Sequence, residues 1–145
     1  MTDGNRGRVE RIFARAEFVR SLGIELVGSG KGWCETRLAL TARHLQQHGL
    51  AHAGVLMTMA DHTCGGAAGS SAAEDKDVIT VENKTSFLRP ASGQELVCRA
   101  AVLRAGKNLV FVEGEVWSER DGERVLAAKM SSTLAVIPLQ REQEG

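Results

Sequence analysis

The chain has 145 residues, which is enough for one domain with a sizeable buried core. Its 18 basic residues balance 18 acidic ones, which argues against nucleic acid or an anionic membrane as the main partner. No apolar run in the sequence approaches the roughly 20 residues that a membrane-spanning helix needs. The three cysteines are scattered along the chain, a spacing that suits reduced thiols better than a disulfide framework or a zinc site. We therefore expect a cytoplasmic protein.

Residues 1–20 favour an amphipathic helix. Apolar side chains recur there at helical spacing, at Val9, Ile12, Phe13, Ala16 and Val19. The arginines of this segment would also suit a transit peptide, but acidic residues stand among them and no signal-peptide core follows. We expect one domain over residues 1–145, with loose ends at 1–8 and 139–145.

Two strands and a loop are predicted next. Residues 22–32 alternate apolar and polar side chains and end in glycines, and residues 33–41 repeat the alternation, so together they predict a hairpin. Residues 42–52 are polar and typical of a loop. One side of the second strand is formed by Cys34, Thr36, Leu38 and Leu40.

An apolar segment, residues 53–68, is too long for one buried strand and rich in Ala, Leu and Met, so it predicts a helix. Because it is apolar nearly all round, we expect other structure to surround it. Asp61 is the one acid in it, and it either marks the edge of the buried part or serves in chemistry. Composition alone favours an acid that simply faces solvent. The helix is expected to break at Gly65, Gly66 and Gly69.

Alternating side chains predict four further strands, at residues 77–88, 94–104, 108–119 and 124–137. Their boundaries are marked by Pro90, by the segment RAGKN and by the hairpin signal Asp121-Gly122. Long antiparallel strands and one buried helix predict an α+β domain, in which a curved antiparallel sheet wraps the helix.

Three motifs follow one another in a characteristic order. The first begins at Gln46 with QQHGLAHAG and continues through VLMTMA to Asp61, and the others are TVENKTSFLRP at 80–90 and RAGKNLVFVEGEV at 104–116. With the order of elements, they make the chain resemble the PaaI-type acyl-CoA thioesterases, which have the hotdog fold. Two positions depart from the family pattern. Gln46 replaces an asparagine but keeps the carboxamide, and Ala53 replaces the first glycine of a His-Gly-Gly step but keeps the backbone N–H.

The resemblance implies hydrolysis of an acyl-CoA thioester without a metal or redox cofactor. Such a reaction needs an activated water and a site for the negative charge that grows on the carbonyl oxygen. The backbone N–H of Ala53, at the positive end of the helix, would take up that charge, with Gln46 as a second donor. Asp61 would act on the water as base or nucleophile, and Thr80 would hold the water or the carboxylate.

The resemblance also assigns residues around the substrate. His52 is expected to shape the loop rather than to titrate in the reaction, and Gly54 to contact the substrate. Arg89, Arg104 and Lys107 would bind the phosphates of coenzyme A, although arginines and lysines on loops often only face solvent.

Ala53 and Asp61 lie eight residues apart, so about 12 Å of helix axis separates them at about 1.5 Å per residue. That distance is too long for both to act on one carbonyl within one subunit. We therefore predict a site shared across a two-fold interface, with Gln46, His52 and Ala53 from one chain and Asp61 and Thr80 from the other. The resemblance likewise implies a homodimer or a dimer of dimers, which is a homotetramer.

Other kinds of site are weaker alternatives. His44, His48 and His52 stand at four-residue steps like metal ligands on a helix, but Gly49 interrupts a helix there and no acid accompanies them. A nucleophilic Cys64 would need a base, which the helix does not place beside it.

Two rival functions use the same fold. A hotdog hydratase or dehydratase would enter the helix through a different, proline-rich pattern. A non-catalytic acyl-CoA-binding or regulatory hotdog protein is the rival from another class. Regulators of that sort carry a DNA-binding segment, for which the N-terminal helix is too small.

Overall fold

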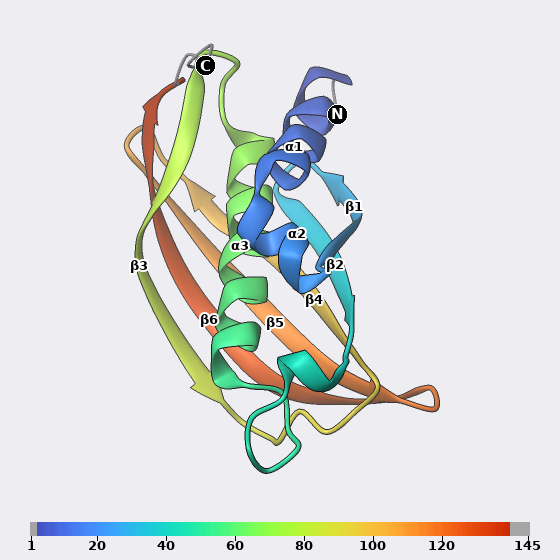
Figure 1. The fold of residues 1–145 in the computed structure, drawn as a ribbon. Helices are drawn as coiled ribbons and strands as arrows, with labels where there is room; N and C mark the ends of the chain where they lie inside the picture. The colour runs from blue at the N-terminus through green and yellow to red at the C-terminus, as the bar shows by residue number, and fades with distance from the viewer. Residues whose placement is uncertain (1–2, 140–145) are drawn as a thin grey trace.

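A computed structural model describes residues 3–139, in which one antiparallel sheet curves around a central helix (Figure 1). The sheet has six strands in the order β1-β2-β4-β5-β6-β3. Within these residues, no helix is both long and apolar enough to cross a membrane. The elements are α1 (Asp3–Arg15), α2 (Glu17–Leu22), β1 (Glu25–Gly30), β2 (Trp33–Ala39), η1 (Ala42–His44), α3 (Ala53–Ser71), β3 (Lys76–Phe87), β4 (Glu95–Ala105), β5 (Leu109–Arg120) and β6 (Glu123–Pro138).

The predicted α+β arrangement is confirmed, since the hairpin, the long helix and the four later strands all form close to their expected positions. The inner face of the sheet packs on α3, and α1 and α2 cover the other side of that helix (Figure 1). On β2 the alternation is also correct, because Cys34, Thr36 and Leu38 are buried. Leu40 is partly buried just beyond the strand.

The N-terminal segment forms two helices instead of the single one predicted. α1 ends at Arg15 and α2 begins at Glu17, because Ala16 between them leaves the helical conformation at ψ 83°. Residues 3–8 already belong to α1, contrary to the expectation of a loose end. Residues 1–2 and 140–145 lie outside the described residues. Near the C-terminus, the backbone N–H of Leu139 donates to the Asp75 carbonyl at 3.0 Å.

Arg8 links α1 to the end of α3. Its guanidinium is buried and donates to four backbone carbonyls, one in the last turn of α3 and three directly after the helix, at distances from 2.9 to 3.3 Å. The last carbonyls of a helix have no partner within the helix, so a buried cation there satisfies them and complements the helix dipole. The four acceptors are Gly69, Ala72, Ala73 and Glu74.

The glycines near the end of α3 do not break it, so that prediction was wrong. The helix continues to Ser71, with Gly66 and Gly69 buried inside it. A Cβ on Gly66 would lie 2.8 Å from Cys34 Sγ, and a Cβ on Gly69 would lie 3.1 Å from Ile12 Cδ1. These glycines therefore allow β2 and α1 to approach the helix closely. In the sequence, glycines that serve close packing look the same as glycines that end a helix.

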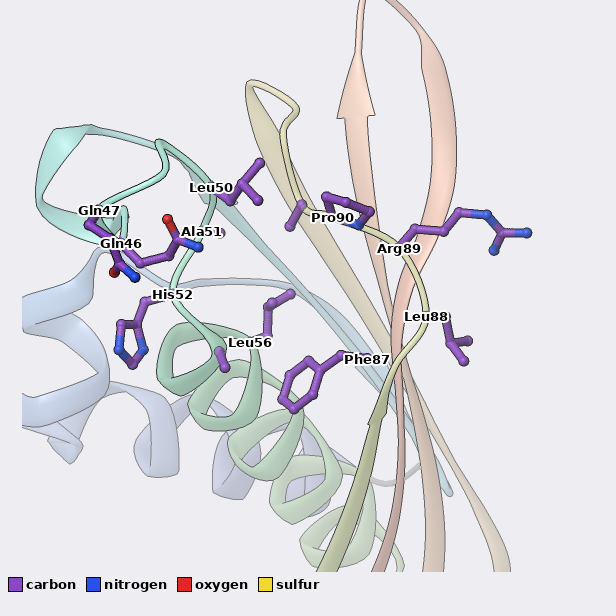
Figure 2. Close-up of a pocket in the computed structure, with 12 residues that line it drawn as sticks. Gln46, Gln47, Leu50, Ala51, His52, Leu56, Phe87, Leu88, Arg89 and Pro90 are labelled. Carbon is purple, nitrogen blue, oxygen red and sulfur yellow. The ribbon is translucent and has the colours of Figure 1, made fainter.

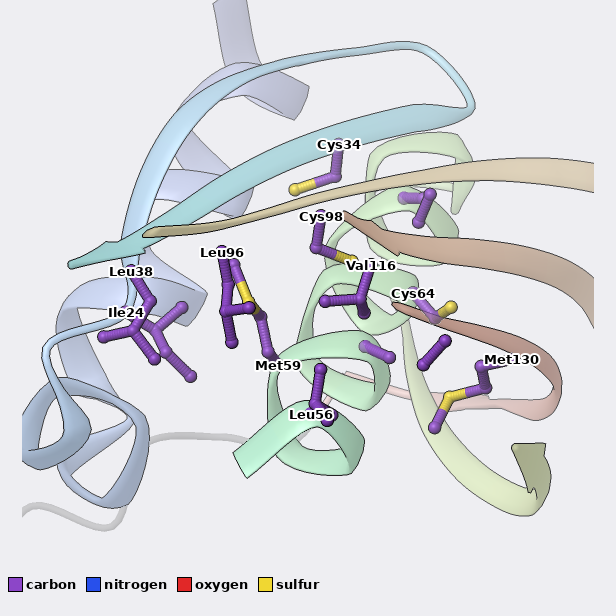
Figure 3. Close-up of a cluster of buried hydrophobic side chains, with 14 of the residues drawn as sticks. Ile24, Cys34, Leu38, Leu56, Met59, Cys64, Leu96, Cys98, Val116 and Met130 are labelled. Carbon is purple, nitrogen blue, oxygen red and sulfur yellow. The ribbon is translucent and has the colours of Figure 1, made fainter. Parts of the chain in front are cut away.

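The three cysteines, far apart in the sequence, contribute to one part of the core (Figure 3). Cys34, Cys64 and Cys98 are buried and free. Burial raises the pKa of Cys34 and of Cys98 to about 12, and it raises the pKa of Cys64 even further. The three thiols therefore stay protonated and pack in the core. They do not suit a nucleophile, because a reactive thiol needs a lowered pKa and access to solvent.

β3 is an edge strand, since it pairs with β6 on one side only within the described sheet. It is also poorly covered, with Ile79 55% and Val81 61% exposed. A long edge with exposed apolar side chains is a template for pairing with another strand.

Candidate active site

A cleft with a volume of about 530 Å³ opens at the N-terminal end of α3 (Figure 2). The loop before α3 forms one wall, and the segment that follows β3 forms the other. The lining is mostly apolar and includes Leu50, Leu56, Phe87, Leu88 and Pro90, with Gln46, Gln47, His52 and Arg89 as its polar members.

The start of α3 leaves one backbone donor available beside this cleft. His52 is the N-cap residue, and its Nδ1 accepts the Gly54 N–H at 2.8 Å. Within the described residues, no hydrogen-bond acceptor takes the N–H of Ala53, which also lines the cleft. Unpaired N–H groups at a helix start, together with the positive end of the dipole, favour a negative oxygen.

The Gly54 N–H, by contrast, is already occupied by His52, and Gly54 is not among the residues that line the cleft. Gly54 therefore offers no free N–H to the cleft of its own protomer, and its contact with substrate stays a prediction. His52 caps the helix start through its Nδ1.

Gln46 lies at the edge of the cleft in a tight loop. Its backbone N–H donates to the Leu50 carbonyl at 2.8 Å, and its carbonyl accepts the Gly49 N–H at 3.0 Å. Gly49 has φ 76°, a left-handed conformation that glycine adopts without strain. The side-chain oxygen of Gln46 accepts the N–H of His48. The amide NH₂ of Gln46 is thereby left as its donor group.

Asp61 lies further along α3, where it is partly exposed and bonded to β3. Its Oδ1 accepts hydrogen bonds from Thr80 Oγ1 at 2.9 Å and from Asn83 Nδ2 at 2.8 Å. Among the described residues, no group donates a hydrogen bond to Oδ2 of Asp61. The carboxylate is thus held through one oxygen, and the other is available to a water molecule.

The sequence prediction included Thr80 but missed Asn83. Residues three apart on a regular strand face opposite sides, so Thr80 and Asn83 would not be expected to point the same way. The register of β3 against β6 shifts between Thr80 and Glu82, which is a β-bulge. One extra residue at the bulge turns both side chains toward α3.

His62 follows Asp61 but belongs to the packing with α1. Its ring meets Phe13 edge-on with the ring centroids 4.4 Å apart, and its Nε2 is buried without a hydrogen-bond partner in the described structure. Burial lowers the pKa of His62, and this effect exceeds the opposite influence of Asp61. His62 is therefore a neutral side chain near neutral pH.

The cationic residues assigned to coenzyme A are not gathered at the cleft of one protomer. Arg89 lines the cleft, but its guanidinium points away from α3 and donates to the Leu126 carbonyl at 3.3 Å (Figure 2). Arg104 lies near the end of β4 and Lys107 in the following turn, and neither lines the cleft.

The histidine series does not form a metal site here. His44 is buried, and its Nδ1 accepts the Thr41 N–H while its Nε2 bonds to the Leu22 carbonyl at 2.6 Å. Both ring nitrogens are therefore used in the fold. In the part of the chain that the structure describes, no three His, Cys, Asp or Glu residues are grouped so as to hold a metal ion.

The start of α3 and the anchored Asp61, which we call the two half-sites, offer different chemistry. The Ala53 N–H at the helix start and the Gln46 amide beside it are donors that suit a developing oxyanion, and the anchored Asp61 is an acceptor for a proton. About 12 Å of helix axis lies between them in one protomer. A central helix with these groups, wrapped by a curved sheet, defines a hotdog-fold protein that carries the groups hydrolysis requires.

Comparisons with known proteins agree with this class. The family model of the thioesterase superfamily matches residues 48–125. A Haemophilus influenzae protein, whose name gives it provisionally as an esterase, is 32% identical over 122 residues, covering 83% of this chain and 86% of that one. The chain therefore belongs to the thioesterase superfamily, and its general class is that of a hydrolase.

Solved structures confirm the fold. A thioesterase family protein of Silicibacter pomeroyi has a TM-score of 0.90 at 34% identity, covering 92% of this chain and 98% of that chain. The PaaI protein of E. coli, from the phenylacetic acid degradation operon, has a TM-score of 0.82 at 20% identity, with 92% and 94% covered. The predicted resemblance to PaaI-type hotdog thioesterases is thus confirmed.

Proposed function

We propose that this protein hydrolyses an acyl-CoA thioester to a free acid and coenzyme A, with Asp61 activating the water. Oδ2 of Asp61 accepts a proton from the water, whose oxygen bonds to the thioester carbonyl carbon. The C–S bond then breaks, and the departing thiolate takes up the proton. The observation that carries the proposal is a partly exposed carboxylate held by Thr80 and Asn83 through only one of its oxygens.

The charge on the carbonyl oxygen is taken up by the Ala53 N–H and by the amide of Gln46. Loss of one such donor costs about 100- to 1,000-fold in kcat in other hydrolases, so these two groups are a substantial part of the proposed mechanism. His52 holds the helix start in place. The reaction as written consumes only water, and it needs no metal or redox cofactor.

The proposed active unit is a homodimer, and two such dimers would form the homotetramer. The distance between the half-sites excludes their joint action on one carbonyl within a protomer. The exposed edge of β3 supports pairing with a second copy. In that dimer, Ala53, Gln46 and His52 of one chain act with Asp61 and Thr80 of the other. Arg104 and Lys107 do not line the cleft of their own protomer, and they are proposed to meet the coenzyme A phosphates together with Arg89.

The first experiment measures thiol release from short-chain, medium-chain, long-chain and aryl acyl-CoA substrates by the wild type and Asp61→Asn. We expect turnover of at least one substrate by the wild type and a loss of about 1,000-fold or more in kcat for the variant, because the amide cannot accept the proton. A chelator should leave the wild-type rate unchanged.

Binding of acyl-CoA by Asp61→Asn, measured by calorimetry, serves as the control because the substitution preserves the shape of the side chain. Binding without turnover in the variant supports the proposal. A folded wild-type protein that binds acyl-CoA but releases no thiol from any substrate contradicts hydrolysis and favours a binding role.

A further inference from the structure

A buried hydroxyl continues the hydrogen-bond chain behind Asp61. Ser132 on β6 is buried, and its Oγ donates to Asn83 Oδ1 at 2.7 Å. Ser132 is paired with Asn83 in the register of β3 and β6. Asn83 therefore lies between a hydroxyl on one side and the carboxylate of Asp61 on the other.

This arrangement fixes the orientation of the Asn83 amide. An ionised carboxylate only accepts hydrogen bonds, so it must face the NH₂ end of the amide. The oxygen end then faces Ser132, whose hydroxyl donates to it. If the amide turned over, an oxygen would lie against the Asp61 carboxylate and lose the bond from Ser132. The hydroxyl and the carboxylate thus favour the same orientation of the amide.

We propose that Asn83, oriented by Ser132, is a positioning residue that holds the Asp61 carboxylate for catalysis. Two donors on Oδ1 restrict rotation of the carboxylate and leave Oδ2 directed at the water. The β-bulge in β3 is what allows both donors to reach the same oxygen. This inference rests on the proposed role of Asp61 and adds a second layer of residues to it.

The test compares kcat, KM and pH–rate profiles of Asn83→Ala, Asn83→Asp and Ser132→Ala. For Asn83→Ala we expect kcat to fall about 10- to 100-fold with little change in KM, which is the effect expected from losing a hydrogen bond to a charged group. Ser132→Ala should give a smaller loss, because the amide remains but can turn over.

Asn83→Asp supplies a readout that a purely structural role would not move. It places a second carboxylate beside Asp61, and two adjacent carboxylates bind a proton more readily than one. The acid limb of the pH–rate profile should therefore move to higher pH by about one unit or more, with activity recovering at alkaline pH.

Ser131→Ala is the matched control, because Ser131 precedes Ser132 on β6 but is exposed on the opposite face. It should keep the wild-type kcat, and circular dichroism should show that all variants remain folded. Wild-type rates and pH profiles for the Asn83 and Ser132 variants, with Asp61→Asn inactive, would overturn the positioning role and leave the proposed function intact. Activity in Asp61→Asn would instead overturn the proposed function itself.

Discussion

At the start of α3, the proposed oxyanion donor is a backbone group, so no side-chain deletion can remove it. Ala53→Pro can remove it, because Ala53 is the first residue of the helix and His52 before it is extended, at φ −62° and ψ 138°. Proline is favoured at the first helical position, and the residue before a proline prefers an extended backbone. We expect a folded protein whose kcat is about 100- to 1,000-fold lower in thiol release.

Ala53→Gly is the matched control, since it keeps the N–H and restores the glycine of the family motif. It should retain activity, with any change confined to KM or to the preferred acyl group. Equal activity in Ala53→Pro and Ala53→Gly would show that the helix start does not bind the oxyanion.

At this scale, the sequence allowed prediction of the residues whose roles follow from local position. Ala53 could be placed at the start of a helix, and Asp61 could be singled out as an unusual acid within an apolar helix. Asn83 could not be found, because its contact with Asp61 depends on a bulge that shifts the alternation of β3 by one residue. The outward direction of Arg89 was likewise not predictable, since its guanidinium bonds to the carbonyl of Leu126 on β6, which is far from it in the sequence.

Among the elements, α3 shows how adjacent glycines can differ. Gly66 is buried against β2, where a Cβ would lie 2.8 Å from Cys34 Sγ and 3.2 Å from Phe13 Cε2. A Cβ on Gly65 would meet nothing within 4 Å. We expect Gly66→Ala to lower the free energy of unfolding by about 1–3 kcal/mol through overpacking. Gly65→Ala should raise it by about 0.5–1 kcal/mol, because alanine favours the helix.

Urea denaturation at a fixed protein concentration measures both changes, and gel filtration checks that the variants keep the same oligomeric state. Equal effects of the two substitutions would mean that Gly66 is not needed for close packing and that its place in the helix is incidental.

The elements themselves were largely predictable because their side chains alternate or repeat with the period of the structure. β2 and β5 have one covered face, so their buried residues recur at every second position. The exceptions depended on tertiary contacts. The glycines of α3 could be taken for a helix end, because the sequence does not show that α1 and β2 pack against them. The position of α1 against α3 likewise involves long-range hydrogen bonds of Arg8, which the sequence does not show.

For the whole molecule, the proposed function requires that two half-sites on one helix serve one reaction. The stripe of α3 that the sheet leaves uncovered includes Met57, 43% exposed, and Asp61, and it lies beside the open edge of β3. A two-fold axis at that edge would extend the sheet and place the α3 helices of the two copies close together. The start of one helix could then lie near the middle of the other.

Mixed dimers test this arrangement directly. One chain carries Asp61→Asn and the other carries Ala53→Pro, with different affinity tags so that only dimers containing both chains are purified. If each site takes its oxyanion donor from one chain and its base from the other, one of the two sites is intact. The mixed dimer should then have about half of the wild-type activity, although each parent alone is slower by about 100-fold or more.

The reverse pairing makes the test decisive. Here a chain carrying both substitutions is combined with a wild-type chain, so a shared arrangement leaves each site with one defect and the dimer inactive. If each site instead lay within one chain, this pair would keep about half of the activity and the first pair would have none. Thiol release from the two purified pairs therefore gives opposite results for the two arrangements, and only activity in the first pair agrees with a site built across the two-fold interface.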